Sequence, residues 1–86
     1  MIKTAYKATF IRQFDALEGA LQSEVLEKIE LFRNPQNHNQ LNVHKLHGPL
    51  KDCYSFSVNY KFRIVFGYIS KNEVAMLTIG DHDVYR

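Results

Sequence analysis

Residues 53–69, CYSFSVNYKFRIVFGYI, decide the fold of this chain because they predict a β-hairpin. In the first half, large apolar side chains alternate strictly with serines, which is the period of a strand with one buried face. The three residues NYK follow, and a second alternating run then starts at Phe62. A connection of this length between two such runs is typical of a hairpin. The segment therefore predicts two antiparallel strands that share one apolar face.

The register of this hairpin places an arginine on the polar face. If Val58 lies opposite Phe62, then Ser57 lies opposite Arg63, on the face away from the aromatic side chains. A shift of one residue would turn every apolar side chain to the wrong face, so the pattern fixes the register strongly.

A third strand, VAMLTI at residues 74–79, follows the short connection SKNE. If Ser70 lies opposite Glu73 in this second hairpin, Arg63 faces Gly80. Both hairpins then agree on one apolar face that helices can cover. The predicted members of that face are Tyr54, Phe56, Val58, Phe62, Ile64, Phe66, Leu77 and Ile79.

The N-terminal half predicts the helices that cover this face. Residues 2–7, IKTAYK, are typical of a short strand, and a helical pattern begins at about Thr9. Gly19 separates it from a second helix, which Pro35 ends because proline lacks a backbone N–H and crowds the preceding turn. We therefore expect an α+β fold, in which an N-terminal strand and a two-helix hairpin pack on one face of an antiparallel sheet of about four strands.

Length and composition indicate one small globular domain over residues 1–86. The chain is 45% hydrophobic and 13% aromatic, which suits a packed core, and 86 residues leave no room for a second one. Its single cysteine, Cys53, allows no intrachain disulfide and fits a reducing compartment. The sequence contains no run of about 18 apolar residues, so it predicts no membrane span. The first residues lack the apolar core of a signal peptide, so we expect a cytoplasmic protein.

The net charge of +2 is a mild excess, well short of a strongly basic nucleic-acid-binding domain. Its distribution is uneven, because residues 34–86 carry six lysines and arginines against four acidic residues, together with all four histidines. An anionic ligand would therefore bind the second half of the chain.

Arg63 is the first candidate for such a contact. A guanidinium on a polar sheet face, beside the hydroxyls of Ser55 and Ser57, can hold a phosphate group. The alternative is an ordinary exposed arginine, because one face of an antiparallel sheet is often solvated.

The last eight residues, IGDHDVYR, supply the other candidates. His82, between two aspartates, suits proton transfer near neutral pH. Tyr85 can stack on a nucleobase. Each has a plain alternative, as a surface histidine in a loose terminus or as a tyrosine that covers the sheet edge.

The connector HKLHG adds further cationic groups at His44, Lys45 and His47. The two histidines have no third ligand at a characteristic spacing, so we expect no metal site and no cofactor. A cation, an imidazole and an aromatic ring are the groups needed to cleave RNA without a metal. The 2′-hydroxyl attacks its own phosphodiester, while the protein positions the strand, stabilises charge and moves two protons.

The chain resembles the RelE/ParE toxins of bacterial type II toxin–antitoxin systems over nearly its whole length. The most specific stretches are HKLHGPLKDCYSFSV, YKFRIVF and IGDHDVYR. The residues that match the family pattern are Leu46, Gly48, Tyr54, Arg63, Phe66, Gly80, His82 and Tyr85. The resemblance implies a RelE-like fold and a cognate antitoxin that silences the toxin.

Within this family, RelE-like members cut mRNA in the ribosomal A site, whereas ParE-like members inhibit DNA gyrase and lack the nuclease residues. The resemblance gives Arg63 the phosphate-stabilising role, His82 the proton-transfer role and Tyr85 the stacking role. His44 resembles a histidine of the YafQ-like nucleases. The chain departs from RelE in having Ser55 and Ser57 where RelE has two lysines, and in its lower net charge.

The leading hypothesis is therefore a ribosome-dependent, metal-independent mRNA endonuclease toxin. The alternatives are a ParE-like gyrase inhibitor and a catalytically inactive homologue that only binds an antitoxin. Its expected partners are an antitoxin, the ribosome and mRNA, and both a homodimer and a heterotetramer with the antitoxin are compatible with the sequence. The expected catalytic residues are Arg63, His82 and Tyr85, and the expected substrate contacts are His44, Lys45, His47, Ser55, Ser57, Lys61 and Arg86.

Overall fold

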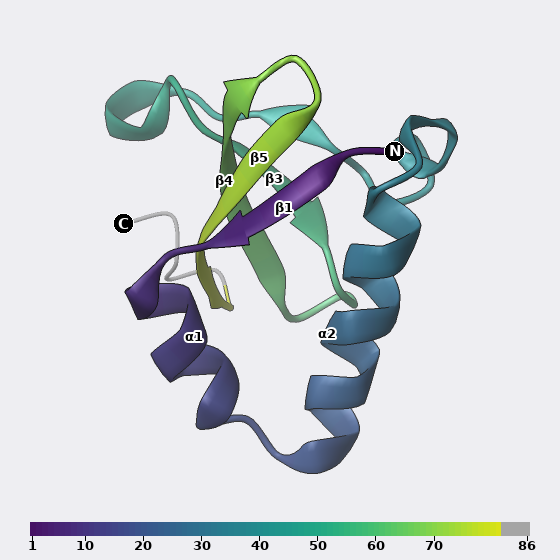
Figure 1. Cartoon of the computed structure of the whole chain (residues 1–86). Coiled ribbons are helices and arrows are strands. Elements are labelled where there is room, and N and C mark those ends of the chain that lie inside the picture. The colour runs from purple at the N-terminus through teal and green to yellow at the C-terminus, as the bar shows by residue number, and fades with distance from the viewer. Residues whose placement is uncertain (82–86) are drawn as a thin grey trace.

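A five-stranded sheet and two helices make up the part of the chain that the structure, a computed structural model, describes, which is residues 1–81 (Figure 1). The elements are β1 (Lys3–Tyr6), α1 (Ala8–Asp15), α2 (Gly19–Phe32), β2 (His44–Lys45), β3 (Tyr54–Ser57), β4 (Arg63–Ser70) and β5 (Glu73–Gly80), with short 3₁₀ helices at Pro35–Asn37 and Gly48–Leu50. The predicted α+β class, with an N-terminal strand and a helical hairpin, is confirmed.

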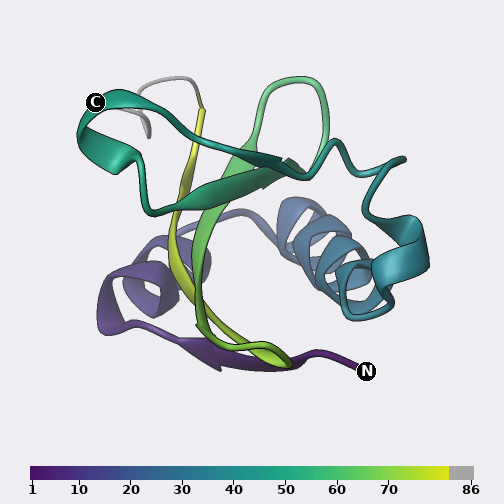
Figure 2. The ribbon, with the colours of Figure 1, turned by 90° about the horizontal axis from the view of Figure 1, so that it is seen from above.

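The sheet differs from the prediction in two details. Its strand order is β1-β5-β4-β3-β2, and β1 pairs with β5 in parallel while the other pairs are antiparallel. The fifth strand is β2, which pairs with β3 in the segment predicted as a plain connector; Figure 2 shows the two lying side by side. A strand of two residues is too short to produce an alternating pattern, so the sequence does not reveal it.

The predicted register is confirmed around Arg63, which pairs with Ser57 on one side and with Gly80 on the other. A β-bulge follows, because Val65 pairs with Thr78 whereas Phe66 pairs with Met76. The extra residue is Leu77.

Because of the bulge, one predicted core position is wrong. Met76 and Val74 lie in the buried cluster, and Leu77, which was expected there, does not. The side chain of Gln13 in α1 caps the bulge, since its Oε1 accepts hydrogen bonds from the Thr78 hydroxyl at 2.9 Å and the Ile79 amide at 2.8 Å.

Phe32 lies at the centre of the core between α2 and the sheet. Its ring stacks on Phe56 at 4.6 Å between centroids and meets Phe66 edge-on at 4.7 Å. The ring of His38 stacks on it at 4.6 Å, and His38 Nε2 donates to the Phe32 carbonyl at 2.8 Å. Val25 and Ile29 of α2 are buried in the same core.

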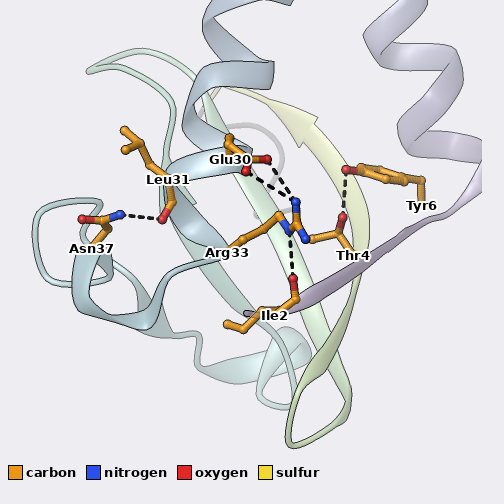
Figure 3. A network of polar contacts seen from close by, with 7 residues as sticks. All are labelled: Ile2, Thr4, Tyr6, Glu30, Leu31, Arg33 and Asn37. Atoms are coloured by element: carbon orange, nitrogen blue, oxygen red, sulfur yellow. Dashed lines mark hydrogen bonds and ion pairs between the residues drawn. The ribbon is translucent and has the colours of Figure 1, made fainter.

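The end of α2 is tied to the start of β1 (Figure 3). Arg33 Nε donates to the carbonyl of Ile2 at 3.1 Å, and its Nη1 forms an ion pair with Glu30 at 3.2 Å. Asn34 accepts a hydrogen bond from the Gln36 amide at 3.1 Å and caps the next 3₁₀ helix, so the helix ends where the Asn-Pro pair predicts. Within residues 1–81, no helix has the length and apolar character needed to cross a membrane.

Candidate functional site

Arg63 is the first residue of β4 and lies between two small cross-strand partners, Ser57 and Gly80. Cross-strand partners share a face of the sheet, so their side chains are the ones that would crowd the guanidinium. A hydroxymethyl group and a hydrogen atom leave room beside it. The strands therefore place a half-buried arginine where an anion can approach.

The guanidinium of Arg63 is fixed by hydrogen bonds from one of its three nitrogens. Nη1 donates to the carbonyl of Asn59 at 3.1 Å and to that of Tyr60 at 3.4 Å. Within the described residues no carboxylate forms a salt bridge with it. Both hydrogen bonds use one nitrogen, so with respect to residues 1–81 Nε and Nη2 remain for the two-point contact that suits a phosphate.

The β3–β4 turn that holds Arg63 is itself fixed. Asn59 Oδ1 accepts hydrogen bonds from the amides of Lys61 at 2.9 Å and Phe62 at 2.8 Å. Asn59 Nδ2 donates to Glu24 of α2 at 2.7 Å. The predicted contact Lys61 is exposed in this turn, with Nζ 5.7 Å from the centroid of the Phe62 ring.

His44 lies on the same face of the sheet as Arg63. It pairs with Ser55, two residues along β3 from the partner of Arg63, and residues two apart on a strand share a face. Two strand spacings and two residues of rise separate the Cα atoms of His44 and Arg63 by about 12 Å. Both side chains can reach one dinucleotide.

The imidazole of His44 has a defined hydrogen-bond partner. Its Nδ1 lies 2.8 Å from the carbonyl of Asn42, whose backbone has a positive φ of 58°. A carbonyl only accepts, so Nδ1 carries the proton. In the neutral ring Nε2 therefore has the lone pair and can act as a base.

Two other predicted contacts of the connector are exposed but lie elsewhere. Lys45 pairs with Tyr54 and so belongs to the opposite face of the sheet from Arg63. His47 precedes the 3₁₀ helix at Gly48–Leu50. The register therefore groups His44 with Arg63 and separates Lys45 from them.

Ser55 requires a correction. It has 0% exposure, so its hydroxyl is not presented to a substrate in this structure, whereas Ser57 is half-buried beside Arg63. Val65 and Ala75, also on the face away from the main core, are buried as well. This face is therefore buried at Ser55, Val65 and Ala75, whereas it is accessible at His44 and beside Arg63. Alternation shows which face a serine occupies but not whether that face is covered.

Three predicted residues, His82, Tyr85 and Arg86, lie outside the described residues. The structure describes the chain up to Asp81, directly after the residue that pairs with Arg63. Their roles stay predictions.

Asn59, Tyr60 and Gln13 were missed by the sequence analysis. An asparagine that opens a hairpin turn is a recognised signal, because its side chain accepts from backbone amides two or three residues on. The contact of Gln13 with the bulge has no local signal, since 65 residues separate it from Thr78. Among residues 1–81, no group of three or more His, Cys, Asp or Glu side chains could hold a metal ion.

The same architecture occurs in solved structures of other bacterial proteins. The conserved hypothetical protein HP0894 from Helicobacter pylori is 22% identical over 96% of this chain and 97% of its own, with a TM-score of 0.72. YafQ from E. coli is 9% identical over 98% and 97%, with a TM-score of 0.72. The toxin–antitoxin complex RelBE2 from Mycobacterium tuberculosis contains a chain 14% identical over 94% and 98%, with a TM-score of 0.71.

The chain has the RelE-like fold. Neither a family model nor a curated protein matches its sequence. The RelE-like fold is therefore carried here by the pattern of strands and helices, with few identical residues.

Proposed function

We propose that this chain is the toxin of a type II toxin–antitoxin pair and that it cleaves mRNA in the A site of the ribosome. The observation that carries the proposal is the place of Arg63 on the RelE-like fold. Small partners surround it, and one corner of its guanidinium is fixed while the other nitrogens remain available among the described residues. His44, on the same face, supports it with an imidazole whose Nε2 can take a proton.

The proposed reaction is an internal transesterification. The 2′-oxygen bonds to the adjacent phosphorus, the bond to the 5′-oxygen breaks, and a 2′,3′-cyclic phosphate and a 5′-hydroxyl result. Arg63 stabilises the charge on the phosphorane oxygens, and His44 Nε2 accepts the 2′-hydroxyl proton. His82 donates a proton to the leaving 5′-oxygen, and Tyr85 stacks on or orients the base. His47, Lys61 and Arg86 are the proposed contacts to the RNA backbone, whereas Lys45 lies on the opposite face and is left out of them.

The proposed protein partner is an antitoxin with an amphipathic segment that folds on binding. An apolar groove of about 180 Å³ between α1 and α2 supports this, and exposed Lys7 and Arg12 lie on α1 and the residue before it. The lining residues are Tyr6, Phe10, Ile11, Phe14, Leu26 and Ile29. An apolar helix face with acidic neighbours fits such a groove. Toxin and antitoxin would meet in the cytoplasm, where the ribosomes are.

Toeprinting on translating ribosomes tests the proposal. Purified protein should produce new A-site cuts, and Arg63→Ala and His82→Ala should each abolish them and relieve growth arrest. Lys71→Ala is the matched control, because this exposed lysine lies in the β4–β5 turn at the opposite end of β4. It should cut like the wild type.

Other outcomes would point to different functions. Intact messages together with DNA-damage signalling would replace the nuclease by a gyrase inhibitor. Intact messages without such signalling, from a folded protein that still binds its antitoxin, would indicate an inactive homologue.

A further inference from the structure

Tyr60 has 90% of its surface exposed, the highest value among the large apolar and aromatic side chains of residues 1–81 that face solvent. A ring with this exposure buries almost nothing and adds almost nothing to the folding free energy. Packing therefore does not explain why an aromatic residue stands at the tip of the β3–β4 turn. An aromatic ring presented to solvent is suited to binding a partner.

The turn that carries Tyr60 is fixed by hydrogen bonds. The amides of Val58 and Asn59 donate to the Phe62 carbonyl at 2.9 Å and 3.4 Å, and Asn59 Oδ1 holds two further amides of the turn. The bond to Glu24 anchors the same turn to α2. A side chain on a fixed backbone loses less conformational freedom when it binds, which favours affinity. In Figure 2 the turn is the green loop that projects from the end of the sheet.

Two cationic residues follow Tyr60 in sequence, and one of them donates a hydrogen bond to its backbone carbonyl. Lys61 is exposed next to it, and Arg63 Nη1 donates to the Tyr60 carbonyl at 3.4 Å. Three residues of chain span at most about 11 Å, so the Tyr60 ring and the Arg63 guanidinium lie within reach of one or two nucleotides. An aromatic face beside cations is the combination that binds single-stranded nucleic acid, with a base stacked on the ring and its phosphate on the cation.

We propose that Tyr60 stacks on a base of the RNA strand whose phosphate is held by Arg63. This inference rests on the proposed function and deepens it by adding a substrate contact on the β3–β4 turn. The contact is separate from that of Tyr85, which follows β5.

The test compares Tyr60→Ala, Tyr60→Leu and Tyr60→Phe with the wild type in single-turnover cleavage on programmed ribosomes. Loss of one stacked base should lower cleavage efficiency about tenfold or more in Tyr60→Ala. Tyr60→Phe should recover most of that loss and Tyr60→Leu little of it, because stacking requires a ring. Ile69→Ala removes an exposed apolar side chain from the opposite end of β4 and should leave cleavage unchanged.

Abasic nucleotides identify the base. One abasic residue is placed in turn at each position of the A-site codon and its 3′ neighbour. At one position it should slow the wild type about as much as Tyr60→Ala does, and it should slow Tyr60→Ala no further.

Three results would overturn the inference. If Arg63→Ala abolishes cutting while Tyr60→Ala cuts at the wild-type rate, Tyr60 does not bind RNA and the proposed function stands. If Tyr60→Ala loses only antitoxin affinity, the ring is a protein contact. If the folded wild-type protein cuts no message, the proposed function fails and the stacking role fails with it.

Discussion

The side chain of Asn59 joins the β3–β4 turn to helix α2, because its Nδ2 donates a hydrogen bond of 2.7 Å to Oε1 of Glu24. The carbonyl of the same asparagine accepts from Arg63 at 3.1 Å. Helix α2 packs on the apolar face of the sheet, whereas Arg63 lies on the opposite face. The orientation of the guanidinium therefore depends on a contact that the turn makes with a helix across the sheet.

Replacing Asn59 by aspartate should disturb this link. The carboxylate keeps the acceptor for the turn amides, but it loses the donor and places a negative charge against Glu24. The expected loss in the free energy of unfolding is about 1–3 kcal/mol, measured by urea denaturation. Adding Glu24→Gln should recover most of it, because the new amide can donate to the new carboxylate. A double variant no more stable than Asn59→Asp would show that the two side chains are not coupled.

Gln13 should control the bulge in β5. In Gln13→Leu the amide of Ile79 loses its acceptor, so we expect destabilisation of about 1–3 kcal/mol and faster hydrogen exchange at Ile79. Gln13→Glu keeps an acceptor and should retain slow exchange. Thr78→Val removes only the hydroxyl contact and serves as the control. Unchanged exchange at Ile79 in Gln13→Leu would argue against a role of this side chain in holding the bulge.

Arg63→Lys should separate charge from geometry. A lysine keeps the positive charge but has no planar fork, so it cannot bind the turn carbonyls and a phosphate together. We expect the single-turnover rate to fall at least about tenfold, and Arg63→Ala to fall about 10²–10³-fold, the range for loss of one stabilising donor. Circular dichroism should show that both variants are folded. Equal rates in Arg63→Lys and the wild type would make the guanidinium dispensable.

The raised pKa of Tyr68 leads us to expect a loss of folding stability at alkaline pH. Its pKa is raised above the ordinary 10.0, first by desolvation and second by the nearby Tyr54. The folded state therefore holds the phenolic proton more tightly than the unfolded state does. Stability is unaffected below about pH 9 and falls as the pH rises through 10 towards the folded-state pKa. Tyr68→Phe keeps the ring contact with Tyr54, centroids 5.2 Å apart, and should flatten the decline. Denaturation midpoints from pH 8 to 11 give the comparison, and an identical slope in both proteins would contradict the assignment.

Phe32 should be the most sensitive core position of α2. Phe32→Ala empties the space between Phe56 and Phe66 and should cost about 3–5 kcal/mol. Leu26→Ala, on the same helix but 56% exposed, should change stability by less than about 1 kcal/mol. Thermal denaturation distinguishes them, and similar losses would mean that the Phe32 cluster is not the centre of the core.

The sequence predicts the parts of the sheet in which apolar and polar side chains alternate. It does not predict the parts that lack this alternation. The serines between apolar residues define the register that brings Ser57, Arg63 and Gly80 together. The run VAML is apolar throughout, so it contains no sign of the bulge that exchanges Leu77 for Met76 in the core. Strand β2 has only two residues, which is too few to show an alternating pattern.

The candidate site divides in the same way. The place of Arg63 follows from strand pairing, which is local. The burial of Ser55 and the anchoring of Asn59 depend on segments distant in sequence, and no short pattern encodes them.

The place of β1 has a consequence for the order of events during synthesis. The ribosome makes β1 first, but its strand partner, β5, is the last strand to be made. A nascent chain that has reached Ser70 therefore contains both helices and four strands, yet β1 has nothing to pair with and β4 has an open edge. Sheets that join distant segments assemble late and slowly. We expect a chain stopped at Ser70 to remain protease-sensitive. The sheet, and any site built on it, is therefore complete only after β5 has been made and has paired with both β1 and β4.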